Sequence, residues 1–348
     1  MSHPFHYFVC LHTFLSITFA TPASTDMSKR FKVFISNPTV PKVAMELLKS
    51  KCEVITTTSY DRIAVLKGIV GVDALLWATH EKLDKELLDA AGPQLKVVGA
   101  MSAGINNIDL NELKQRGIKL GNTPVVLNNA VADIAIGLAL GASRRFTEGR
   151  KHIEESTWPS HFNTQWMLGR DITGSTVGIV GFGGIGQTIA KRLKGFDVAK
   201  MLYTGHKEKP EGQKLGATFV DLNTLTQNSD FIFLSAPLNN ETLHMCNADF
   251  FKKMKKTGVL INVARGPLVD QDALITALKT GEIFAAGLDV MTPEPMNPDN
   301  ELLKLPNVFV TPHIGSATEN TRNAMAELTA QNILRGLGGE EMFTPVHL

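Results

Sequence analysis

The sequence predicts an α/β fold with two doubly wound parallel sheets, and two observations support this prediction. From Phe31 onward, short apolar runs alternate with segments of helical periodicity, the pattern of parallel strands joined by crossover helices. A long apolar helical pattern interrupts this alternation, which starts again at Thr176. Since the chain has 348 residues, each half is long enough to bury a hydrophobic core of its own.

In the first half, several runs have the length and apolar character of buried strands. These expected strands are Phe31–Ile35, Cys52–Ile55, Ala74–Trp77, Leu95–Ala100 and Ile118–Leu120. The helices expected between them are Val43–Lys49, Arg62–Lys67, Lys85–Ala91 and Leu110–Arg116. A longer helix is expected over Asn128–Lys151. Because Ala130–Leu140 is apolar nearly all round and Arg144 and Arg145 follow, we expect this helix to be buried between two domains and not in a membrane.

The second half repeats the rhythm. Its expected strands are Thr176–Val180, Ala199–Tyr203, Ala217–Val220, Phe231–Ser235, Val259–Val263, Ala285–Leu288 and Val308–Thr311. The turn Ile314–Ser316 then leads into a C-terminal helix expected over Glu319–Gly336. Since this helix follows the last strand of the second domain, we expect it to cross back and pack on the first.

A glycine motif directly follows the strand expected at Thr176–Val180. Gly181, Gly183 and Gly186 form the spacing G-x-G-x-x-G, and a helical pattern begins at once. In such a loop the first glycine permits a tight turn, the second lets the backbone approach a pyrophosphate, and the third allows helix and strand to pack closely. The helix N-terminus adds N–H groups for the anion. The motif therefore predicts a dinucleotide site, and a glycine-rich turn without a ligand is the alternative.

The next expected strand ends where a dinucleotide enzyme selects the ribose of its cofactor. An enzyme specific for NAD normally has Asp or Glu there, but this chain has Thr204-Gly205-His206-Lys207. A carboxylate would repel a 2′-phosphate, whereas Thr, His and Lys side chains can donate hydrogen bonds to it. The segment therefore favours NADP over NAD, and the alternative is that it is a polar loop with no role in the choice.

Composition excludes several classes of function. A formal net charge of +1 argues against nucleic acid as a partner. The cysteines Cys10, Cys52 and Cys246 form no close pair and no cluster with histidine, so neither a disulfide framework nor a metal site is expected. Such cysteines fit a reducing compartment, and we expect a cytoplasmic protein.

The first 26 residues differ from the rest. Phe5–Ala20 is mostly apolar and ends in a passable signal-peptidase site, but no Lys or Arg precedes it and His12 interrupts the run. The segment is also too short and too polar for a membrane-spanning helix. We interpret residues 1–26 as an extension outside the fold, with a signal peptide as the alternative, and Met27 as the start of the folded part.

Three polar residues follow expected strands of the second domain, at the sheet edge where such folds bind ligands. Arg265 offers a planar fork of donors for a carboxylate, His313 can exchange a proton near neutral pH, and Glu294 can hold the histidine ring. Each alone has a plain alternative: a surface ion pair, a polar loop residue or a solvated loop carboxylate. Together they favour an active site in the cleft between the domains.

These motifs resemble those of the D-isomer-specific 2-hydroxyacid dehydrogenases, and within that family most closely those of the glyoxylate/hydroxypyruvate reductases. The resemblance extends from about Lys32 to the C-terminus and includes the order and spacing of Arg265, Glu294 and His313. The other matching motifs are the glycine loop, Tyr203–Gly205, Phe250–Met254, Asn262–Gly266, Ala286–Val290, Pro293–Pro295 and Pro312–Ala317.

The resemblance implies a flavodoxin-like catalytic domain formed by residues 27–125 plus 317–348, and a Rossmann domain for NAD(P) over residues 126–316. The implied reaction is the reduction of a small 2-oxo acid, glyoxylate or hydroxypyruvate, by NADPH to glycolate or D-glycerate. A homodimer without membrane or nucleic-acid partners is also implied.

Carried onto this sequence, the resemblance implies that Arg265 binds the substrate, His313 donates the proton to its carbonyl oxygen, and Glu294 orients and charges His313. Further substrate contacts are expected from Ser102, Ala103 and Gly104. Cofactor contacts are expected from Gly181, Gly183, Gly184, Ile185, Gly186, Thr204, Gly205, His206, Lys207, Ser235, Ala236, Pro237, Val263, Ala264, Asp289, His313 and Gly315. Of these, Asp289 would hold the nicotinamide amide, and Ser235–Pro237 would line the adenosine side.

The chain departs from the family pattern at two positions. Asn106 stands where relatives commonly have Asp, and His161 stands where a tryptophan is expected, with Trp158 nearby. Both positions bear on which 2-oxo acid is preferred.

Other proteins of this fold set the alternatives. Phosphoglycerate dehydrogenases often carry an added regulatory domain, for which the 12 residues after Gly336 are too few, and S-adenosylhomocysteine hydrolases have longer chains. A corepressor that binds a dinucleotide and a protein partner is the remaining alternative. A corepressor would not need Arg265, Glu294 and His313 at the spacing typical of the family. Turnover of any 2-oxo acid therefore distinguishes a dehydrogenase from a corepressor.

Overall fold

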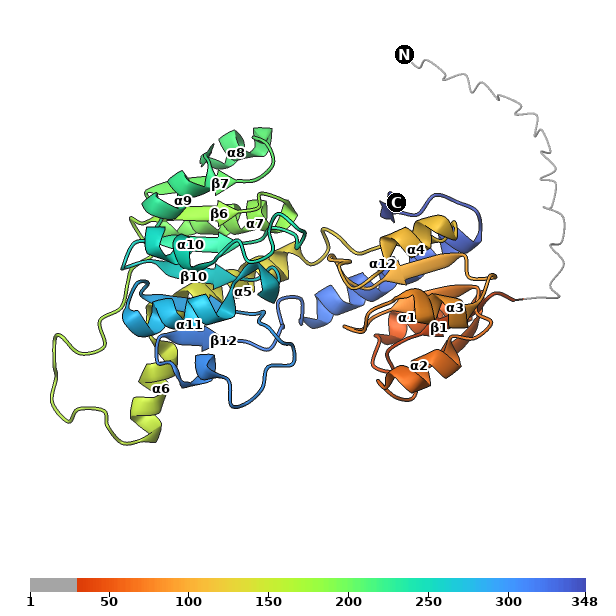
Figure 1. Cartoon of the computed structure of the whole chain (residues 1–348), viewed down its shortest axis with the longest axis horizontal. Helices are drawn as coiled ribbons and strands as arrows, with labels where there is room; N and C mark the ends of the chain where they lie inside the picture. Colours follow the sequence, from red (N-terminus) through yellow and green to blue (C-terminus); the bar gives the residue numbers. More distant parts are fainter. Residues whose placement is uncertain (1–29) are drawn as a thin grey trace, which may run out of the picture. The chain divides into compact units, whose positions relative to one another are not determined.

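The structure is a computed structural model that describes residues 30–348. Residues 1–26, and with them the choice between an extension and a signal peptide, lie outside the described residues, as does Cys10. From Phe31 to Leu348 the chain forms one compact unit with two β-sheets and helices packed on them (Figure 1). The predicted fold class, two α/β domains with parallel sheets, is confirmed.

The first sheet has the strand order β13-β5-β4-β3-β1-β2. Its parallel strands are β1 (Lys32–Ile35), β2 (Glu53–Thr56), β3 (Ala74–Trp77), β4 (Val97–Ala100) and β5 (Lys119–Gly121). The helices between them are α1 (Lys42–Lys49), α2 (Arg62–Gly68), α3 (Lys85–Ala91) and α4 (Leu110–Gln115). The order 2-1-3-4-5 is that of flavodoxin-like sheets. An antiparallel edge strand, β13 (Pro345–Val346), is too short for periodicity to predict.

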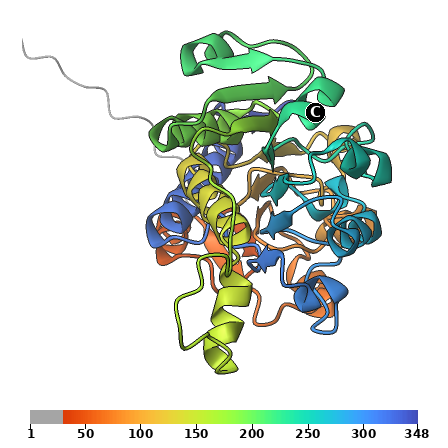
Figure 2. The same cartoon turned by 90° about the vertical axis from the view of Figure 1, so that its left-hand side faces the viewer.

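The second sheet is parallel throughout and has the order β12-β11-β10-β9-β6-β7-β8 (Figure 2). Its strands are β6 (Thr176–Val180), β7 (Lys200–Thr204), β8 (Ala217–Phe219), β9 (Phe231–Leu234), β10 (Val259–Asn262), β11 (Ala285–Leu288) and β12 (Val308–Val310). Its connecting helices are α7 (Gly184–Leu193), α8 (Pro210–Leu215), α9 (Leu222–Asn228), α10 (Ala248–Lys253) and α11 (Gln271–Thr280). The order 3-2-1-4-5-6 is that of Rossmann sheets, here with one further strand. Its switch point, between β6 and β9, brings the glycine loop next to the segment that follows β9.

Local signals explain where these elements begin. The helices α3, α4, α9 and α11 each start after an aspartate whose carboxylate accepts a hydrogen bond from an N–H of the first turn. The strands β3, β4, β9 and β10 are buried along their whole length, which is why their sequences are apolar apart from Asn262 at the end of β10.

The single helix expected over Asn128–Lys151 is wrong, because the structure divides it into α5 (Asn128–Ser143) and α6 (Phe146–Glu154). Arg145 lies at the break with a φ of 59°, and its guanidinium pairs with Glu148 of α6 at 2.7 Å. Neither Gly nor Pro marks this break in the sequence. The expected position between two domains is also corrected, since α5 packs on α7, β10, β11 and β12 and is buried against the second sheet.

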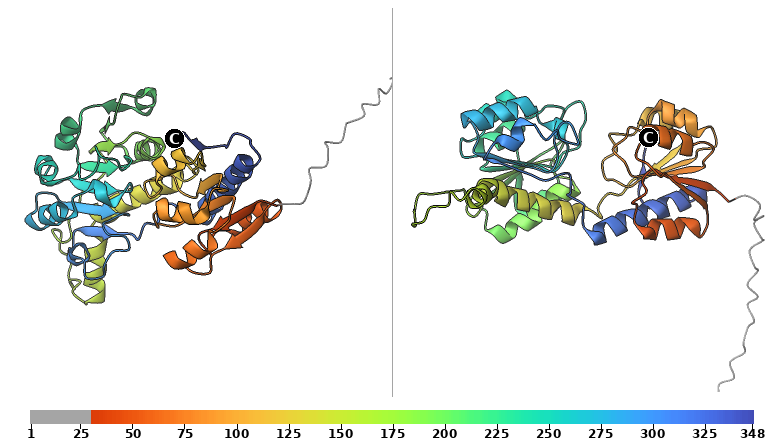
Figure 3. Two further views of the ribbon diagram at one scale, coloured as in Figure 1. Left: turned by 45° about the vertical axis from the view of Figure 1, so that its right-hand side comes forward. Right: turned by 90° about the horizontal axis from the view of Figure 1, so that it is seen from below.

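The C-terminal helix α12 (Glu319–Leu337) crosses back to the first sheet. It packs on β3, β4, β5 and α1, and it can be followed in blue beside the N-terminal strands in Figure 3. Gly99 in β4 permits this approach, because an added Cβ would lie 2.8 Å from Ile333 of α12. None of the helices within residues 30–348 combines the length and hydrophobicity that crossing a membrane requires.

Candidate active site

The loop after β6 is shaped by its glycines. Gly181 has a φ of +87°, and a Cβ there would lie 2.5 Å from the backbone N of Ala236. A Cβ on Gly186 would lie 2.2 Å from the carbonyl oxygen of Gly181, so only glycine lets α7 start this close to the strand. Around Gly183, no described atom lies within 4 Å of an added Cβ. The loop therefore leaves open the place where a pyrophosphate approaches, and it fits a dinucleotide.

The segment expected to select the ribose lies after β7. No carboxylate occurs from Thr204 to Lys207, and the side chain of His206 is 79% exposed. Its Nδ1 lies 3.8 Å from the exposed carboxylate of Glu241. The segment can therefore donate hydrogen bonds to a phosphate, although the negative charge of Glu241 opposes the same ligand.

Arg265 is held at the end of β10 by the buried side chain of Asn262. This amide accepts a hydrogen bond from Ala264 N and donates one to Arg265 O, which closes the turn. The guanidinium extends to the first domain, where its Nε donates to Asn106 Oδ1 at 2.8 Å. Burial lowers the pKa of Arg265, but a guanidinium remains charged at physiological pH. The turn thus directs a fixed positive charge between the two domains.

Opposite this guanidinium, the segment after β4 presents two N–H donors. Ser102 Oγ donates to Gly104 O, and Asn122 Nδ2 donates to Ala103 O, so the carbonyl groups are satisfied. Within the described residues, no acceptor pairs with the N–H of Ala103 or Gly104. A Cβ on Gly104 would lie 1.8 Å from Arg265 Nη2. The guanidinium therefore lies beside Gly104, and both line the same cleft as Ala103.

Glu294 and His313 form a hydrogen-bonded pair, with His313 Nδ1 2.7 Å from Glu294 Oε2. The other carboxylate oxygen accepts from Met291 N at 3.0 Å. Burial pushes the pKa of Glu294 upward, but the hydrogen bonds from His313 and Met291 outweigh it and hold that pKa below its usual value. Glu294 is therefore ionised at neutral pH, and its carboxylate accepts the hydrogen bond from His313 Nδ1. Because Nδ1 is engaged, Nε2 is the atom that can exchange a proton with a substrate.

Asp289 fixes the turn that carries His313. Its buried carboxylate accepts hydrogen bonds from Thr311 Oγ1 at 2.6 Å and from the N–H groups of Ile314 and Gly315, both at 2.8 Å. His313 has a φ of 53°, a conformation that such support stabilises. This structural role is absent from the sequence motif, because the partners lie 22 to 26 residues away along the chain.

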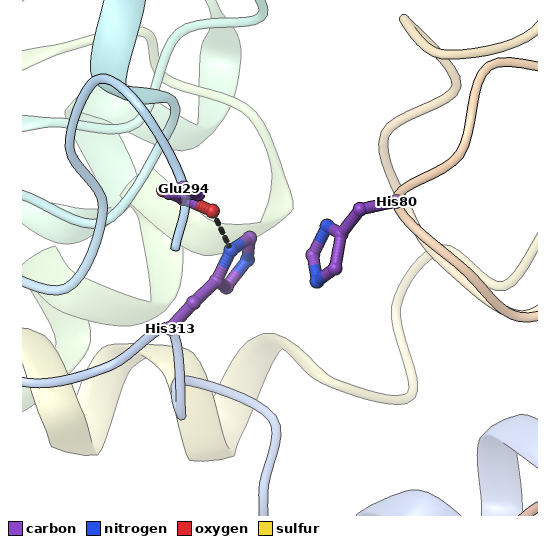
Figure 4. A group of neighbouring side chains, drawn as sticks. All are labelled: His80, Glu294 and His313. Carbon is purple, nitrogen blue, oxygen red and sulfur yellow. Dashed lines mark hydrogen bonds and ion pairs between the residues drawn. The ribbon is translucent and has the colours of Figure 1, made fainter. Parts of the chain in front are cut away.

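His80 is a residue of this site that sequence reasoning misses. It follows β3 of the first sheet, and its ring centroid lies 5.4 Å from that of His313 (Figure 4). Partial desolvation in the cleft and the charge of His313 lower the pKa of His80, while Glu294 opposes this shift. His80 is therefore a neutral imidazole at neutral pH. Its only signal in the sequence is that it comes shortly after a buried strand.

These groups line one cleft of about 780 Å³, a volume typical of small-molecule sites. From the first domain it is lined by His80, Ser102, Ala103, Gly104 and Asn106. From the second domain it is lined by Ile185, Val263, Arg265, Asp289, Glu294, His313 and Gly315. The other residues expected to contact the cofactor do not line this cleft and lie at the ends of β6, β7, β9 and β10. The cleft therefore unites the expected substrate residues with only part of the expected cofactor site.

Residues 136–315 match the family model described as D-isomer specific 2-hydroxyacid dehydrogenase, NAD binding domain. The matched range contains the glycine loop and the residues Arg265, Glu294 and His313. The chain belongs to the D-isomer-specific 2-hydroxyacid dehydrogenases. It is therefore an NAD(P)-dependent oxidoreductase.

Relatives of this dehydrogenase match both of its domains. It is 44% identical over 320 residues to the glyoxylate reductase/hydroxypyruvate reductase of Mus musculus, covering 90% of this chain and 97% of the relative. It is 42% identical over 315 residues to the glyoxylate reductase of Pyrococcus horikoshii, covering 89% and 93%. Among solved structures, the NADPH-dependent glyoxylate/hydroxypyruvate reductase of Sinorhizobium meliloti, in complex with NADP and malonate, is similar with a TM-score of 0.81 and 34% identity, covering 91% and 97%.

Proposed function

We propose that this dehydrogenase reduces a small 2-oxo acid, glyoxylate or hydroxypyruvate, to the D-2-hydroxy acid, glycolate or D-glycerate, with NADPH as the cofactor. The observation that carries the proposal is the convergence of Arg265, the N–H groups of Ala103 and Gly104, and the pair of Glu294 and His313 in one cleft. The names of the mouse and archaeal relatives agree with this substrate class.

The substrate carboxylate binds to Arg265 and to the two N–H groups that follow β4. A planar guanidinium can pair with a carboxylate through two parallel hydrogen bonds, which fixes orientation as well as position. Asn106 holds Arg265 through a neutral amide, so no protein carboxylate neutralises the guanidinium from that side. Since the carbonyl group is adjacent to the carboxylate in a 2-oxo acid, its oxygen is then directed towards His313.

His313 donates its Nε2 proton to the carbonyl oxygen, and Glu294 keeps the ring oriented and charged. The dinucleotide, when bound, supplies the hydride for the carbonyl carbon. Asp289 holds the turn of His313 in place and retains acceptor capacity on its carboxylate for a carboxamide. In the reverse direction, His313 takes the proton from the hydroxyl group and must start as a neutral imidazole.

The preference for NADPH is supported by the absence of a carboxylate from Thr204 to Lys207. The Sinorhizobium meliloti relative, named as NADPH-dependent, agrees with this preference. The carboxylate of Glu241 lies 3.8 Å from the ring of His206, and its negative charge repels a 2′-phosphate. We therefore expect Glu241 to reduce the preference for NADPH over NADH.

We assign residues 27–125 plus 317–348 to the substrate-binding domain and residues 126–316 to the dinucleotide domain. A homodimer in the cytoplasm is also part of the proposal. Exposed apolar side chains along α6 and the segment after it support the dimer, because a second copy of the chain would bury them. These side chains are Phe146, Ile153, Trp158, Phe162 and Leu168.

An initial-rate matrix tests the proposal. NADPH and NADH are each combined with glyoxylate, hydroxypyruvate, pyruvate and a bulky 2-oxo acid, and the consumption of the reduced cofactor is measured. We expect the highest kcat/KM for NADPH with glyoxylate or hydroxypyruvate. Binding of NADPH without turnover of any 2-oxo acid would instead favour the corepressor alternative.

A further inference from the structure

We propose that a divalent transition-metal ion, Zn²⁺ in the first instance, binds between His80, Glu294 and His313 and stops the reaction. Binding rests on the geometry of the three side chains alone. The loss of activity rests in addition on the function proposed above.

The three side chains come from separate loops and meet in the cleft (Figure 4). One ligand atom from each, a ring nitrogen or a carboxylate oxygen, lies within 4.8 Å of the others. In a tetrahedral zinc site with bonds of about 2.0–2.1 Å, ligand atoms lie about 3.3–3.4 Å apart, so the most distant pair must approach by up to about 1.4 Å. His80 permits this contraction, because its residue is exposed and its ring already lies against that of His313.

The chemistry of the three donors suits zinc. Two imidazoles and one carboxylate are typical protein ligands of this ion, and a set of three leaves a fourth position for water or an anion. The side chain of Glu294 also supplies one negative charge. The guanidinium groups of Arg265 and Arg322 line the same cleft and oppose a cation. We therefore expect reversible binding, weaker than that of a structural zinc site.

An ion at this place acts on the proposed reaction through His313. If the ion is coordinated by a ring nitrogen of His313 or by the carboxylate of Glu294, the hydrogen bond between these two side chains is disturbed. His313 can then no longer act as the proton donor of the proposed reaction. The ion also occupies space next to Arg265 that the 2-oxo acid needs. Inhibition is therefore expected to be competitive with the 2-oxo acid, and a chelator should reverse it.

The binding experiment uses the full chain with Co²⁺ as a spectroscopic probe and Zn²⁺ as the competitor. The parent is compared with His80→Ala, with His80→Gln, which keeps a polar side chain of similar size, and with His347→Ala. The last variant is the matched control, because His347 is exposed and lies outside the cleft. We expect a Co²⁺ absorption band in the parent and the control, displaced by one equivalent of Zn²⁺, and an affinity lower by at least about tenfold in both His80 variants. Equal affinity in all four proteins would overturn the proposal.

The activity experiment measures the ratio of the inhibited to the uninhibited rate within each protein, so that any change in basal rate cancels. Half-inhibition should need at least about tenfold more Zn²⁺ in the His80 variants than in the parent and the control. Unchanged sensitivity of both His80 variants would contradict the inhibitory role. If the parent binds Zn²⁺ through His80 but reduces no 2-oxo acid, the metal site stands and the proposed function fails.

Discussion

The glycine loop and the catalytic loops share the carboxyl edge of the second sheet but are built on different principles. The shape of the glycine loop after β6 is set by its backbone. There is no room for a Cβ at Gly186, because such an atom would lie only 2.2 Å from the carbonyl oxygen of Gly181. The catalytic loops after β10, β11 and β12 are defined by side chains that other side chains hold, as Asn262 holds the turn of Arg265 and Asp289 holds that of His313. The glycine loop should therefore respond to changes in volume, and the catalytic loops to changes in charge.

The largest effect is expected for Arg265→Ala in the catalytic loops. Loss of a buried, charge-assisted pair costs about 2–5 kcal/mol, so kcat/KM for the 2-oxo acid should fall by on the order of 10³. The dissociation constant of NADPH should change little. Arg265→Lys is the matched control, since it retains the charge without the planar fork and should recover only part of the loss. Steady-state kinetics with fluorescence titration of NADPH measures both, and an unaltered kcat/KM would remove Arg265 from the site.

A smaller effect is expected for Gly186→Ala in the glycine loop. The added methyl group meets backbone 2.2 Å away, so the loop must shift, at a cost of roughly 1–3 kcal/mol of stability. NADPH binding should weaken with it. Gly195→Ala is the control, because no described atom lies within 4 Å of its Cβ. Thermal unfolding and NADPH titration should separate the two variants, and identical behaviour would contradict the steric account of the loop.

The smallest effect is expected for His206→Asp, because this residue is exposed and its contribution is screened by water. A new carboxylate opposes a 2′-phosphate, so the ratio of kcat/KM with NADPH to that with NADH should fall by about tenfold, or roughly 1.4 kcal/mol. Glu241→Gln removes the neighbouring charge and should move the ratio in the opposite direction. An unchanged ratio in both variants would remove this loop from cofactor selection.

The same comparison explains what the sequence could predict. The glycine loop is local in sequence, so its spacing and its strand–helix context suffice to predict it. Arg265, Glu294 and His313 are distant from one another, but each follows a strand, and parallel strands bring their carboxyl ends to one edge. His80 escapes prediction because it comes from the other domain, and only the tertiary arrangement places its ring 5.4 Å from that of His313.

The break between α5 and α6 is hidden for a related reason. Hydrophobic periodicity continues through it, and the residue at the break, Arg145, is one that rarely adopts a positive φ. Its local pair with Glu148 depends on side-chain geometry that periodicity does not encode. Regular elements and their order could therefore be predicted, whereas a single unusual backbone conformation could not.

The central claim is that Glu294 keeps His313 charged for proton donation, and the Glu294→Gln variant tests it while retaining the shape of the side chain. Since its hydrogen bonds hold the pKa of Glu294 below its usual value, the carboxylate is ionised at neutral pH. Reduction needs the imidazolium and is lost as pH rises; oxidation needs the neutral ring and is lost as pH falls. Without the carboxylate charge, both transitions should move to lower pH.

The measurement is kcat/KM against pH in both directions for the parent, for Glu294→Gln and for Glu46→Gln, whose carboxylate is exposed on α1 and serves as the control. We predict that both limbs of the Glu294→Gln profile move to lower pH, while those of Glu46→Gln coincide with the parent. Coincident profiles for Glu294→Gln and the parent, or a shift to higher pH, would contradict the claim.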